Sequence, residues 1–400
     1  MIPFPHPALA CAALAALLLP LAAAAGDHPP VANVVQIHAF QQDEGHDGRT
    51  ALVESRDGGL YGVTIGGGAG PYFHGALLRV GREGKVAMVA GFGGDTEVGG
   101  QPGSTPVEGD DEAIYGTTQL GGAHNYGTVW RFDKTTGALT ALYAFVPNDP
   151  SAIVSNTFLT LGRDGWLYGA SQTDGAQDRG FLFRLHTDGS KFQVLHDFTG
   201  GDDGAEPASR PVQAHDGAFY GTARSGAFND CGVIYKFTAS AGFEVLNPMC
   251  TGADFEPSHS DAELIGDPDG NFYGTSEFGG AYGGGTIFRR NVDGSIDTLK
   301  SFLKGKFRPY GPSARLALDK KGNLYGVTRW GGEHAKGTVF RLDPKHGFNI
   351  VHAFGADPKQ KDGRYPWGPL THTSDGRFFG MTAGGGPKSF FGTVYELAQE

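Results

Sequence analysis

The chain has 400 residues, more than one compact core usually contains, so several domains or an array of repeats is expected. Its 66 Gly residues follow no three-residue period, which excludes collagen, and an aromatic content of 12% is too high for a disordered chain. The net charge of −11 argues against a nucleic-acid-binding protein, which would need a basic face.

The first thirty residues differ in composition from the rest of the chain. An apolar run rich in Ala and Leu ends with Ala23 and Ala25 at the spacing of a signal-peptide cleavage site. This pattern predicts a signal peptide over residues 1–25, with an uncleaved anchor as the alternative. Cys11 precedes most of the apolar run, so lipidation is not expected. No second long apolar stretch follows, and we expect a secreted or periplasmic protein without a membrane span.

The remaining sequence repeats itself with a period of about 53 residues. A Tyr-Gly pair recurs at intervals of 52 to 54 residues, and the Gly of motifs such as GTVF follows it by 12 to 14 residues. The first marker lies at Tyr61, Tyr115, Tyr168, Tyr220, Tyr273, Tyr325 and, as Phe, at Phe379. The second lies at Gly75, Gly127, Gly180, Gly232, Gly285, Gly337 and Gly392. Seven units therefore cover residues 26–400 as a single domain.

Each unit is expected to form four short antiparallel strands, named A to D in chain order. Strand B carries Tyr-Gly and strand C carries GTVF, and both are too short and too rich in Gly, Thr and aromatic residues for helices. An Asp-Gly turn usually joins A to B. Four-stranded units of this length are typical of β-propeller blades, with an open β-solenoid as the alternative. Gly after the aromatic residue is expected to let neighbouring blades approach.

The two ends of the chain favour a closed ring. A strand of type D, Asn33–Phe40, precedes the first complete unit, and no such strand follows the last strand C. In a ring the N-terminal strand completes the last blade, which removes both open edges. The prediction is an all-β, seven-bladed β-propeller whose last blade is closed by the N-terminal strand.

The combined motif DGxLYGTTxxGGxxxxGTVFxL…VLHAF is similar to the GloVer tandem repeat of exported bacterial proteins, described as choice-of-anchor proteins. The resemblance spans all seven units and implies an exported repeat protein, without implying a particular activity. Many members carry a C-terminal anchoring segment. Because the sequence stops at Glu400, just past the last expected strand, surface anchoring by that route is not expected.

Polar residues that recur in each unit are expected to be structural. One position of strand C carries a base in six units, which predicts ion pairs between blades or at the rim, and one position of strand D carries His. The first set is Arg79, Arg131, Arg184, Lys236, Arg289 and Arg341, with Glu396 in the seventh unit, and the second is His38, His196 and His352. No G-x-S-x-G or H-E-x-x-H motif is present, and Asp267–Phe272 lacks the Gly and Glu of a calcium loop. We expect no metal and no cofactor.

Two cysteines remain after the signal peptide. Cys231 precedes strand C and Cys250 follows strand D of the same unit, so a hairpin folded about Ser240 and Ala241 would place them opposite each other. An oxidising compartment favours a disulfide between them, with two free thiols as the alternative.

The B–C and D–A loops share one face of the ring and are long and varied, so they form the candidate binding face. Unrepeated aromatic and His side chains there suit stacking and hydrogen bonding with sugars, although they could instead only pack the loops. The candidate ligand-binding residues are Trp330, His334, Tyr365, Trp367, Tyr126 and Tyr282. Further unrepeated side chains in these loops are Tyr72, Phe73, His74, His124, Phe228 and Phe390.

The sequence predicts an exported, monomeric binding or interaction module whose partner is a carbohydrate or another envelope protein. A carbohydrate-active enzyme, a lyase or hydrolase with acids at the channel mouth, is one alternative. A structural envelope protein is another. A converging, unrepeated set of Asp, Glu, His and Arg with perturbed pKa values would favour the enzyme, whereas a flat aromatic face would favour binding.

Overall fold

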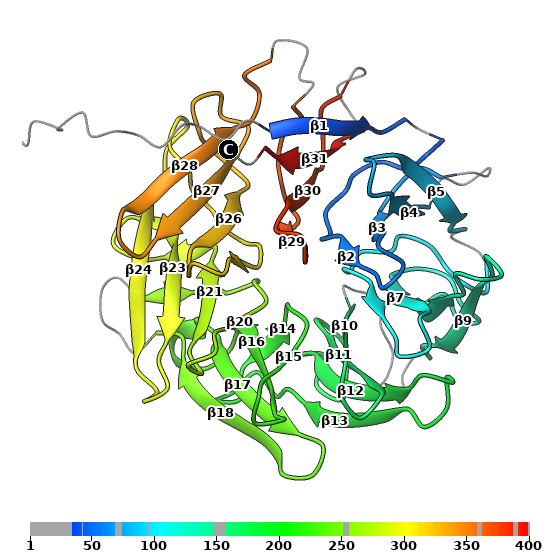
Figure 1. Ribbon diagram of the computed structural model, residues 1–400. Helices are drawn as coiled ribbons and strands as arrows, with labels where there is room; N and C mark the ends of the chain where they lie inside the picture. The colour runs from blue at the N-terminus through cyan, green and yellow to red at the C-terminus, as the bar shows by residue number, and fades with distance from the viewer. Residues whose placement is uncertain are drawn as a thin grey trace, which may run out of the picture. The chain divides into compact units, whose positions relative to one another are not determined.

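The computed structural model describes residues 34–41, 43–68, 74–93, 96–146, 157–250, 256–357, 362–386 and 391–398. These residues form seven antiparallel sheets arranged as a seven-bladed β-propeller, which confirms the predicted fold. Strand A of each blade lies nearest the centre of the ring and strand D lies outermost (Figure 1). The expected signal peptide lies outside the described residues.

The first three blades follow one another along the chain. Blade 1 consists of β2 (Val53–Glu54), β3 (Leu60–Thr64), β4 (Ala76–Val80) and β5 (Val86–Gly91). Blade 2 consists of β6 (Val107–Glu108), β7 (Ile114–Thr118), β8 (Thr128–Phe132) and β9 (Leu139–Ala144). Blade 3 consists of β10 (Thr157–Leu161), β11 (Trp166–Ser171), β12 (Phe181–His186) and β13 (Gln193–Asp197).

Blades 4 and 5 carry additional short strands. Blade 4 consists of β14 (Ala205–Pro207) and β15 (Val212–Gln213), which both pair with β16 (Phe219–Ser225), then a 3-10 helix η1 (Phe228–Asp230), β17 (Val233–Thr238) and β18 (Gly242–Pro248). Blade 5 consists of β20 (Ile265–Gly266), β21 (Phe272–Ser276), β23 (Gly283–Arg290) and β24 (Ile296–Leu303). Its loops contribute a separate small sheet of β19 (Pro257–Ser258) and β22 (Phe278–Gly279).

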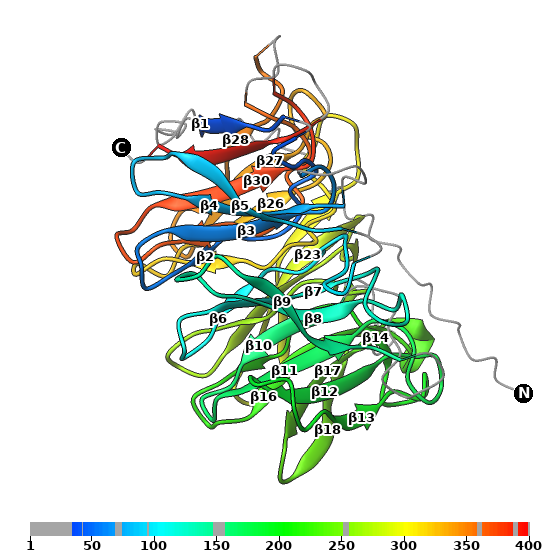
Figure 2. The same cartoon turned by 90° about the vertical axis from the view of Figure 1, so that its right-hand side faces the viewer.

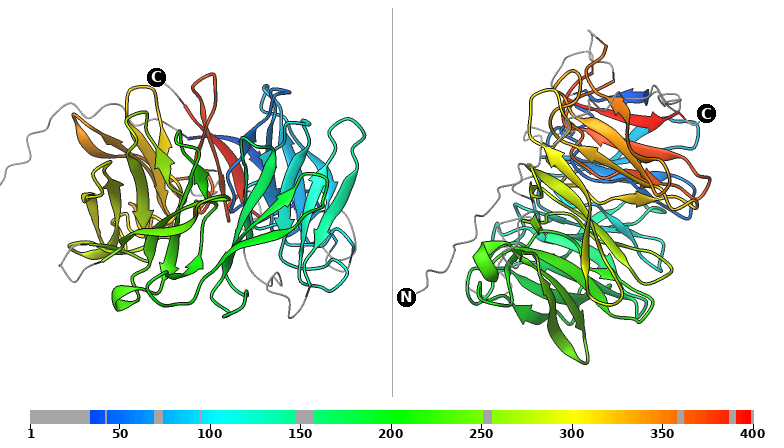
Figure 3. Two further views of the ribbon diagram at one scale, coloured as in Figure 1. Left: turned by 90° about the horizontal axis from the view of Figure 1, so that it is seen from below. Right: turned by 90° about the vertical axis from the view of Figure 1, so that its left-hand side faces the viewer.

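The last two blades bring the chain back to its beginning. Blade 6 consists of β25 (Ala317–Leu318), β26 (Leu324–Thr328), β27 (Thr338–Asp343) and β28 (Gly347–Ala353). Blade 7 consists of β29 (Thr371–His372), β30 (Phe378–Thr382), β31 (Thr393–Leu397) and β1 (Val34–Ala39). In views from the side, the strands run across the thickness of the ring, so the turns and loops gather on its two faces (Figure 2; Figure 3).

The N-terminal strand closes the ring as predicted. β1 pairs antiparallel with β31, from Val34 opposite Leu397 to Ala39 opposite Thr393. Phe40, directly after β1, is buried in an apolar cluster that contains Leu60 of blade 1 together with residues of blade 7. The same cluster includes Leu52, Ala76, Leu78, Val80, Phe379, Met381 and Val394. Backbone hydrogen bonds and apolar packing therefore both join the two ends of the chain.

The Gly after the aromatic residue of strand B makes room for a ring of its own blade. Gly169 lies opposite Phe183 in the pairing of β11 with β12, and a Cβ on Gly169 would lie 2.2 Å from that ring. The equivalent pairs in other blades are Gly116–Trp130, Gly221–Tyr235, Gly274–Phe288, Gly326–Phe340 and Gly380–Tyr395. In these six blades the glycine therefore serves packing inside one sheet, and our expectation of a close approach between blades was wrong.

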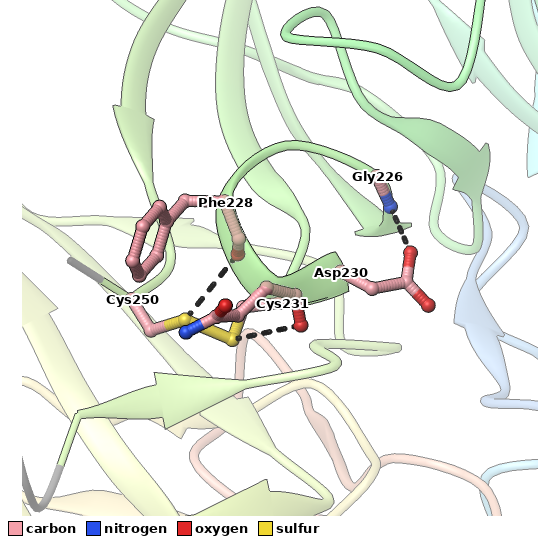
Figure 4. The surroundings of a disulfide bond; sticks show 6 residues. Gly226, Phe228, Asp230, Cys231 and Cys250 are labelled. Atoms are coloured by element: carbon pink, nitrogen blue, oxygen red, sulfur yellow. Dashed lines mark hydrogen bonds between the residues drawn. A yellow bond between two sulfur atoms is a disulfide. The ribbon is translucent and has the colours of Figure 1, made fainter. Parts of the chain in front are cut away.

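Cys231 and Cys250 form the predicted disulfide, with their Cα atoms 5.8 Å apart. Figure 4 shows the bridge beside η1, where Asp230 accepts a hydrogen bond from the Gly226 N–H. Closing a loop of 19 residues contributes about 3 kcal/mol in the chain-entropy model.

The hairpin that carries this disulfide differs in detail from the expected one. Thr238 pairs with Gly242, so three residues form the turn, whereas two were predicted. A β-bulge between Ile234 and Tyr235 then shifts the register by one residue and brings Val233 opposite Pro248. The cysteine pairing was correct because the bulge compensates for the longer turn. A bulge at this place recurs in the C–D pairing of all seven blades.

Deleting residues 26–40 should destabilise the ring strongly. The truncated chain would lose β1 and the buried Phe40 side chain, whose loss alone typically costs about 3–5 kcal/mol, and would leave an open edge at β31. We expect a lower melting temperature and aggregation in sedimentation experiments, partly reversed by a peptide of residues 33–40. Deleting only residues 26–33 retains β1 and is the matched control. A truncated chain that stays monomeric with the control's melting temperature would show that β1 is not needed for closure.

Candidate functional site

Five of the six repeated bases of strand C form ion pairs within their own blade, whereas Arg184 donates hydrogen bonds to Gln193. Asp57, in the A–B turn of blade 1, accepts a hydrogen bond from Tyr61 (2.9 Å) and pairs with Arg79 (3.1 Å). Burial and the Asp57 carboxylate raise the pKa of Tyr61 to about 12. Blades 2 and 4 repeat this arrangement with Asp111, Tyr115 and Arg131, and with Asp216, Tyr220 and Lys236. These contacts explain why Asp, Tyr and a base recur together.

Each repeated histidine of strand D contacts a carboxylate in the loop that follows it. His196 contacts Asp203 at 3.1 Å and packs edge-on against Phe198. His38 pairs with Glu44 in the same way, and His352 pairs with Asp362. The Asp267 carboxylate accepts hydrogen bonds from Asn271 and Tyr273 inside its turn. In the part of the chain that the structure describes, no group of three or more His, Cys, Asp and Glu side chains is arranged to bind a metal ion.

Three of the six aromatic and His candidates lie together, and three lie elsewhere. The rings of Trp330 and Tyr365 are 5.5 Å apart, edge to face, and Trp367 lies beside them on the same cavity wall. His334 is exposed in the loop after Trp330. Tyr126 packs against the apolar cluster between blades 2 and 3, and Tyr282 is 60% exposed on blade 5. Tyr72, Phe73 and Phe390 lie outside the described residues.

In the D–A loops that the structure describes, the backbone directs one or two side chains at the centre of the ring. In blade 7, Arg364 forms a β-bridge with Gly384, and Tyr365 then adopts a positive φ of 55°. After this reversal the chain is extended, so that Trp367 and Pro369 face inward, two residues apart. The same left-handed residue occurs at Asp47, Gln101, Glu206, His259 and Gly311 of other blades. Because it recurs, this backbone strain belongs to the propeller framework.

These side chains line a central cavity of about 750 Å³. A third position, four residues after the aromatic residue of strand B, completes the wall. The position of Trp367 contributes Arg49, Gly103, Ala208, Asp261, Ser313 and Trp367. The position of Pro369 contributes Thr105, Phe158, Arg210, Glu263, Arg315 and Pro369. The third contributes Ile65, Gln119, Gln172, Arg224, Glu277 and Arg329. Each wall position therefore varies from blade to blade inside a repeated backbone.

One carboxylate of the cavity binds two arginines. Arg210 Nε lies 2.7 Å from Glu263, and Arg315 Nη1 lies 3.1 Å from its other oxygen. Only 12% of the Glu263 side chain is exposed. Burial raises the pKa of Glu263, but the two guanidinium groups outweigh burial and lower it overall, so this residue is ionised. Two cations share one anion at this point, and the Arg315 Nε–H lacks a hydrogen-bond partner among the described residues.

Two further carboxyl groups flank Arg224. Its Nη1 lies 3.3 Å from Asp261 and its Nη2 lies 3.6 Å from Glu277. Burial raises the pKa of Asp261 to about 6, and the negative charge of Glu277 adds to the effect, although Arg224 opposes it. Asp261 Oδ1 has no hydrogen-bond partner in the described part of the chain. Asp261 can therefore gain or lose a proton at a pH of about 6. Glu263, two residues further along the chain, stays ionised.

Arg329 is the cavity cation with the fewest polar contacts. Among the described residues, no carboxylate forms an ion pair with it and its Nε–H has no acceptor. Its guanidinium carbon lies 3.2 Å from the centroid of Trp367 and 4.7 Å from that of Trp330. Burial lowers its pKa, and Glu277 offsets this only in part; arginine nevertheless stays charged at neutral pH. Arg49, which pairs with Asp47, covers Trp367 at 4.3 Å.

A smaller side cavity of about 290 Å³ adjoins the central one. Arg49, Arg329 and Trp367 line both cavities. Its remaining wall comes from loops of blades 1, 6 and 7, namely His46, Asp47, Trp330, Arg364, Tyr365, Ala383 and Gly384. The aromatic residues that the sequence singled out therefore lie at the border between the two cavities.

The charged residues of the central cavity were not among the residues predicted from the sequence. The predicted residues were unrepeated side chains of the loops, and polar residues that recur in each unit were expected to be structural. The missed signal is the third wall position: four residues after the Tyr of strand B, the side chain changes from Ile65 and Gln119 to Arg224, Glu277 and Arg329. A position that changes charge from unit to unit, while its neighbours repeat, is not selected for the packing of the blade.

Because the pKa of Asp261 is raised, the contribution of this residue to the unfolding free energy should decrease as the pH rises. Between about pH 4 and about pH 6 the unfolded chain loses the Asp261 proton while the folded chain keeps it. The unfolding free energy of the wild type, relative to Asp261→Asn, should therefore fall by up to about 3 kcal/mol across this window, at about 1.4 kcal/mol per pKa unit. Denaturant unfolding at several pH values measures this difference.

A rim carboxyl provides the control of opposite sign. The pKa of Asp57 is lowered, because its contacts with Gly59, Tyr61 and Arg79 outweigh burial. The unfolding free energy of the wild type relative to Asp57→Asn should therefore rise with pH over the acid range and fall as the carboxyl is protonated. Equal pH dependence of the wild type and Asp261→Asn would contradict a protonated Asp261.

No curated protein matches the chain in sequence. Among solved structures, the chain is similar to an oligogalacturonate lyase from Vibrio parahaemolyticus, with a TM-score of 0.53 and 11% identity over 91% of this chain and 93% of that one. It is also similar to a gluconolactonase from Xanthomonas campestris, with a TM-score of 0.42 and 12% identity over 80% of this chain and 89% of that one. At such identities the likeness concerns the fold alone.

None of the helices within the described residues is long and apolar enough to cross a membrane. In sequence, the repeat described as the Gloeobacter/Verrucomicrobia repeat matches residues 28–215 and 208–400, which together span nearly all of the seven blades. The chain therefore belongs to the Gloeobacter/Verrucomicrobia repeat family, the GloVer repeat that its sequence resembles.

Proposed function

We propose that the protein binds an acidic carbohydrate in the central cavity. The observation that supports this function is an excess of inward-facing guanidinium groups over carboxyl groups. Five arginines and three acidic residues line the cavity, although the whole chain has a net charge of −11. Arg210 and Arg315 share Glu263, and Arg329 has no carboxylate partner among the described residues. A ligand that carries carboxylates would supply the missing anions with bidentate hydrogen bonds.

The other wall residues favour a polyhydroxylated ligand over a simple anion. Gln119 and Gln172 present amide groups, which both donate and accept hydrogen bonds, and Glu277 and Asp261 can accept from hydroxyl groups. Trp367 offers an aromatic surface against which a sugar ring can pack. A site for inorganic phosphate alone would need only the cations. The cavity volume of about 750 Å³ lies within the range of small-molecule sites, about 300–1,000 Å³.

Oligogalacturonates are suitable first probes. They combine hydroxyl groups with one carboxylate per unit, and they are named in the lyase that shares the propeller fold. With 11% identity that likeness concerns the fold alone, so the proposal depends on the cavity residues.

We also propose that the protein acts outside the cytoplasm. The signal-like segment of residues 1–25 and the Cys231–Cys250 disulfide support this location, because disulfides persist in oxidising compartments. Carbohydrates of the cell envelope or of the surroundings are then the accessible ligands.

A second function, cleavage of the bound carbohydrate, is favoured by the two carboxyl groups at Arg224. Asp261 keeps a proton up to a pH of about 6, while Glu263 and the cavity arginines remain charged. A pair of groups in different protonation states is what acid–base cleavage of a glycosidic bond requires. Asp261 would donate a proton to the departing sugar oxygen, and Glu277 would accept one from water or from the sugar carbon.

Replacing Arg329 by Gln should weaken ligand binding without unfolding the protein. Wild type should bind trigalacturonate but not maltotriose in isothermal titration calorimetry, with lower affinity as salt increases. Arg329→Gln should lower this affinity about 10- to 100-fold, since a hydrogen bond to a charged group contributes about 1.5–3 kcal/mol. Trp367→Ala should also weaken binding. Both variants should retain nearly the wild-type melting temperature.

Arg163→Gln is the matched control, because the Arg163 side chain is exposed beside an A–B turn, at the opposite face. It should bind trigalacturonate as the wild type does. Equal binding of the acidic and neutral trisaccharides, or binding of neither, would contradict the proposed function. A collapse of the melting temperature in Trp367→Ala would identify that ring as a packing element.

Cleavage and binding are distinguished by the fate of the ligand. If the protein is an enzyme, incubation with oligogalacturonates should produce shorter chains, detected by chromatography. The rate should decrease as the pH rises through about 6, because the proton of Asp261 is then lost. Asp261→Asn should abolish cleavage while it retains binding. Complete recovery of intact ligand at every pH would leave the protein as a binding module.

A further inference from the structure

The side cavity extends the central cavity along one direction. Arg49, Arg329 and Trp367 line both cavities, and both guanidinium groups contact the Trp367 ring at this border. A ligand in the central cavity that extends past Trp367 would reach the loops of blades 6, 7 and 1.

The side cavity repeats the chemistry of the central one on a smaller scale. Arg49, Arg329 and Arg364 line it together with one carboxylate, Asp47, so cations again exceed anions. Asp47 is paired with Arg49 at 2.6 Å. Trp330 and Tyr365 provide an aromatic wall, and Lys336 donates a hydrogen bond to the Tyr365 hydroxyl at 3.2 Å. Positive charge beside aromatic rings thus occurs twice, on either side of Trp367.

We propose that the ligand is an acidic oligosaccharide of at least two units, with one unit in the central cavity and the next in the side cavity. This inference rests on the proposed function and specifies its ligand. A polymer with one carboxylate per unit presents anions at regular intervals, which matches two cation-rich compartments in sequence. Trp367 separates the units, and Trp330 and Tyr365 pack against the second one.

Tyr365 would be placed for this role by the backbone. In the described D–A loops the N–H of the left-handed residue bonds the preceding blade, and in blades 1, 2, 5, 6 and 7 its carbonyl accepts a hydrogen bond from the third wall position of its own blade. In blade 7 these bonds join Tyr365 to Lys336 and to Ala383. The small Ala383 side chain replaces the longer side chains of the other blades, which leaves room beside Tyr365 for the side cavity.

Affinity as a function of chain length tests the inference. Calorimetry with galacturonic acid, digalacturonate, trigalacturonate and tetragalacturonate should show an affinity increase of at least 10-fold from the monomer to the dimer or trimer. Trp330→Ala and Arg364→Gln should reduce trigalacturonate affinity to nearly that of the monomer. Neither change should alter the affinity for galacturonic acid itself.

Trp166→Ala is the matched control for Trp330→Ala. Trp166 also stacks with an arginine, Arg184 at 4.5 Å, but it begins strand B at the face with the A–B turns. This variant should bind every ligand as the wild type does. If Trp330→Ala does not fold, Arg364→Gln still supplies the test.

Failure of this inference differs from failure of the proposed function. Equal affinity for monomer and trimer, or an equal loss of both in Trp330→Ala and Arg364→Gln, would overturn the two-unit ligand while acidic carbohydrate binding stands. If no acidic saccharide binds at all, both are overturned.

Discussion

Pairing between the first and the last strand is the contact on which the propeller depends. Each of the other blades is formed from one continuous stretch of chain, but blade 7 obtains β1 from the opposite end of the sequence. This pairing fixes the number of blades at seven and removes the two sheet edges that an open array would expose. It also sets the width of the central space, since Phe40 packs blade 7 against blade 1. The cavity exists in its present form only because the ring is closed.

The repeat provides a rigid frame in which a few positions are free to change. Glycine, aromatic residues and the rim contacts of Asp, Tyr and a base recur because each stabilises the same packing in every blade. Up to three inward positions per blade line the central cavity, and their side chains are not needed for that packing. Variation at these positions gives the symmetric ring an asymmetric interior, with acids on blade 5 and arginines on blades 4, 6 and 1. In such a fold, binding residues are expected at the positions that differ between the repeats.

Two buried carboxyl groups of the cavity differ in pKa because their surroundings differ. Glu263 lies between two arginines and stays ionised, whereas Asp261 shares one guanidinium with Glu277 and keeps its proton up to a pH of about 6. Desolvation acts on both Glu263 and Asp261, so the number of cations within reach decides the difference. The result is a cavity with permanent positive charge and one group that can exchange a proton. By the criterion of a converging, unrepeated charged set, catalysis is a stronger alternative than the sequence suggested.

The sequence by itself determined the repeat, the strand order, the number of blades and the closing strand, because these follow from local patterns and from counting strands at the two ends. It also singled out Trp330, Tyr365 and Trp367, which lie together on one cavity wall. Only the tertiary structure decided which side chains face the centre. That choice depends on strand-like pairing and a left-handed residue in the described D–A loops, and the left-handed position is occupied by residues as different as Asp47 and Tyr365. The charged cavity combines residues from blades far apart in the chain, and their approach across the ring leaves no periodic signal in the sequence.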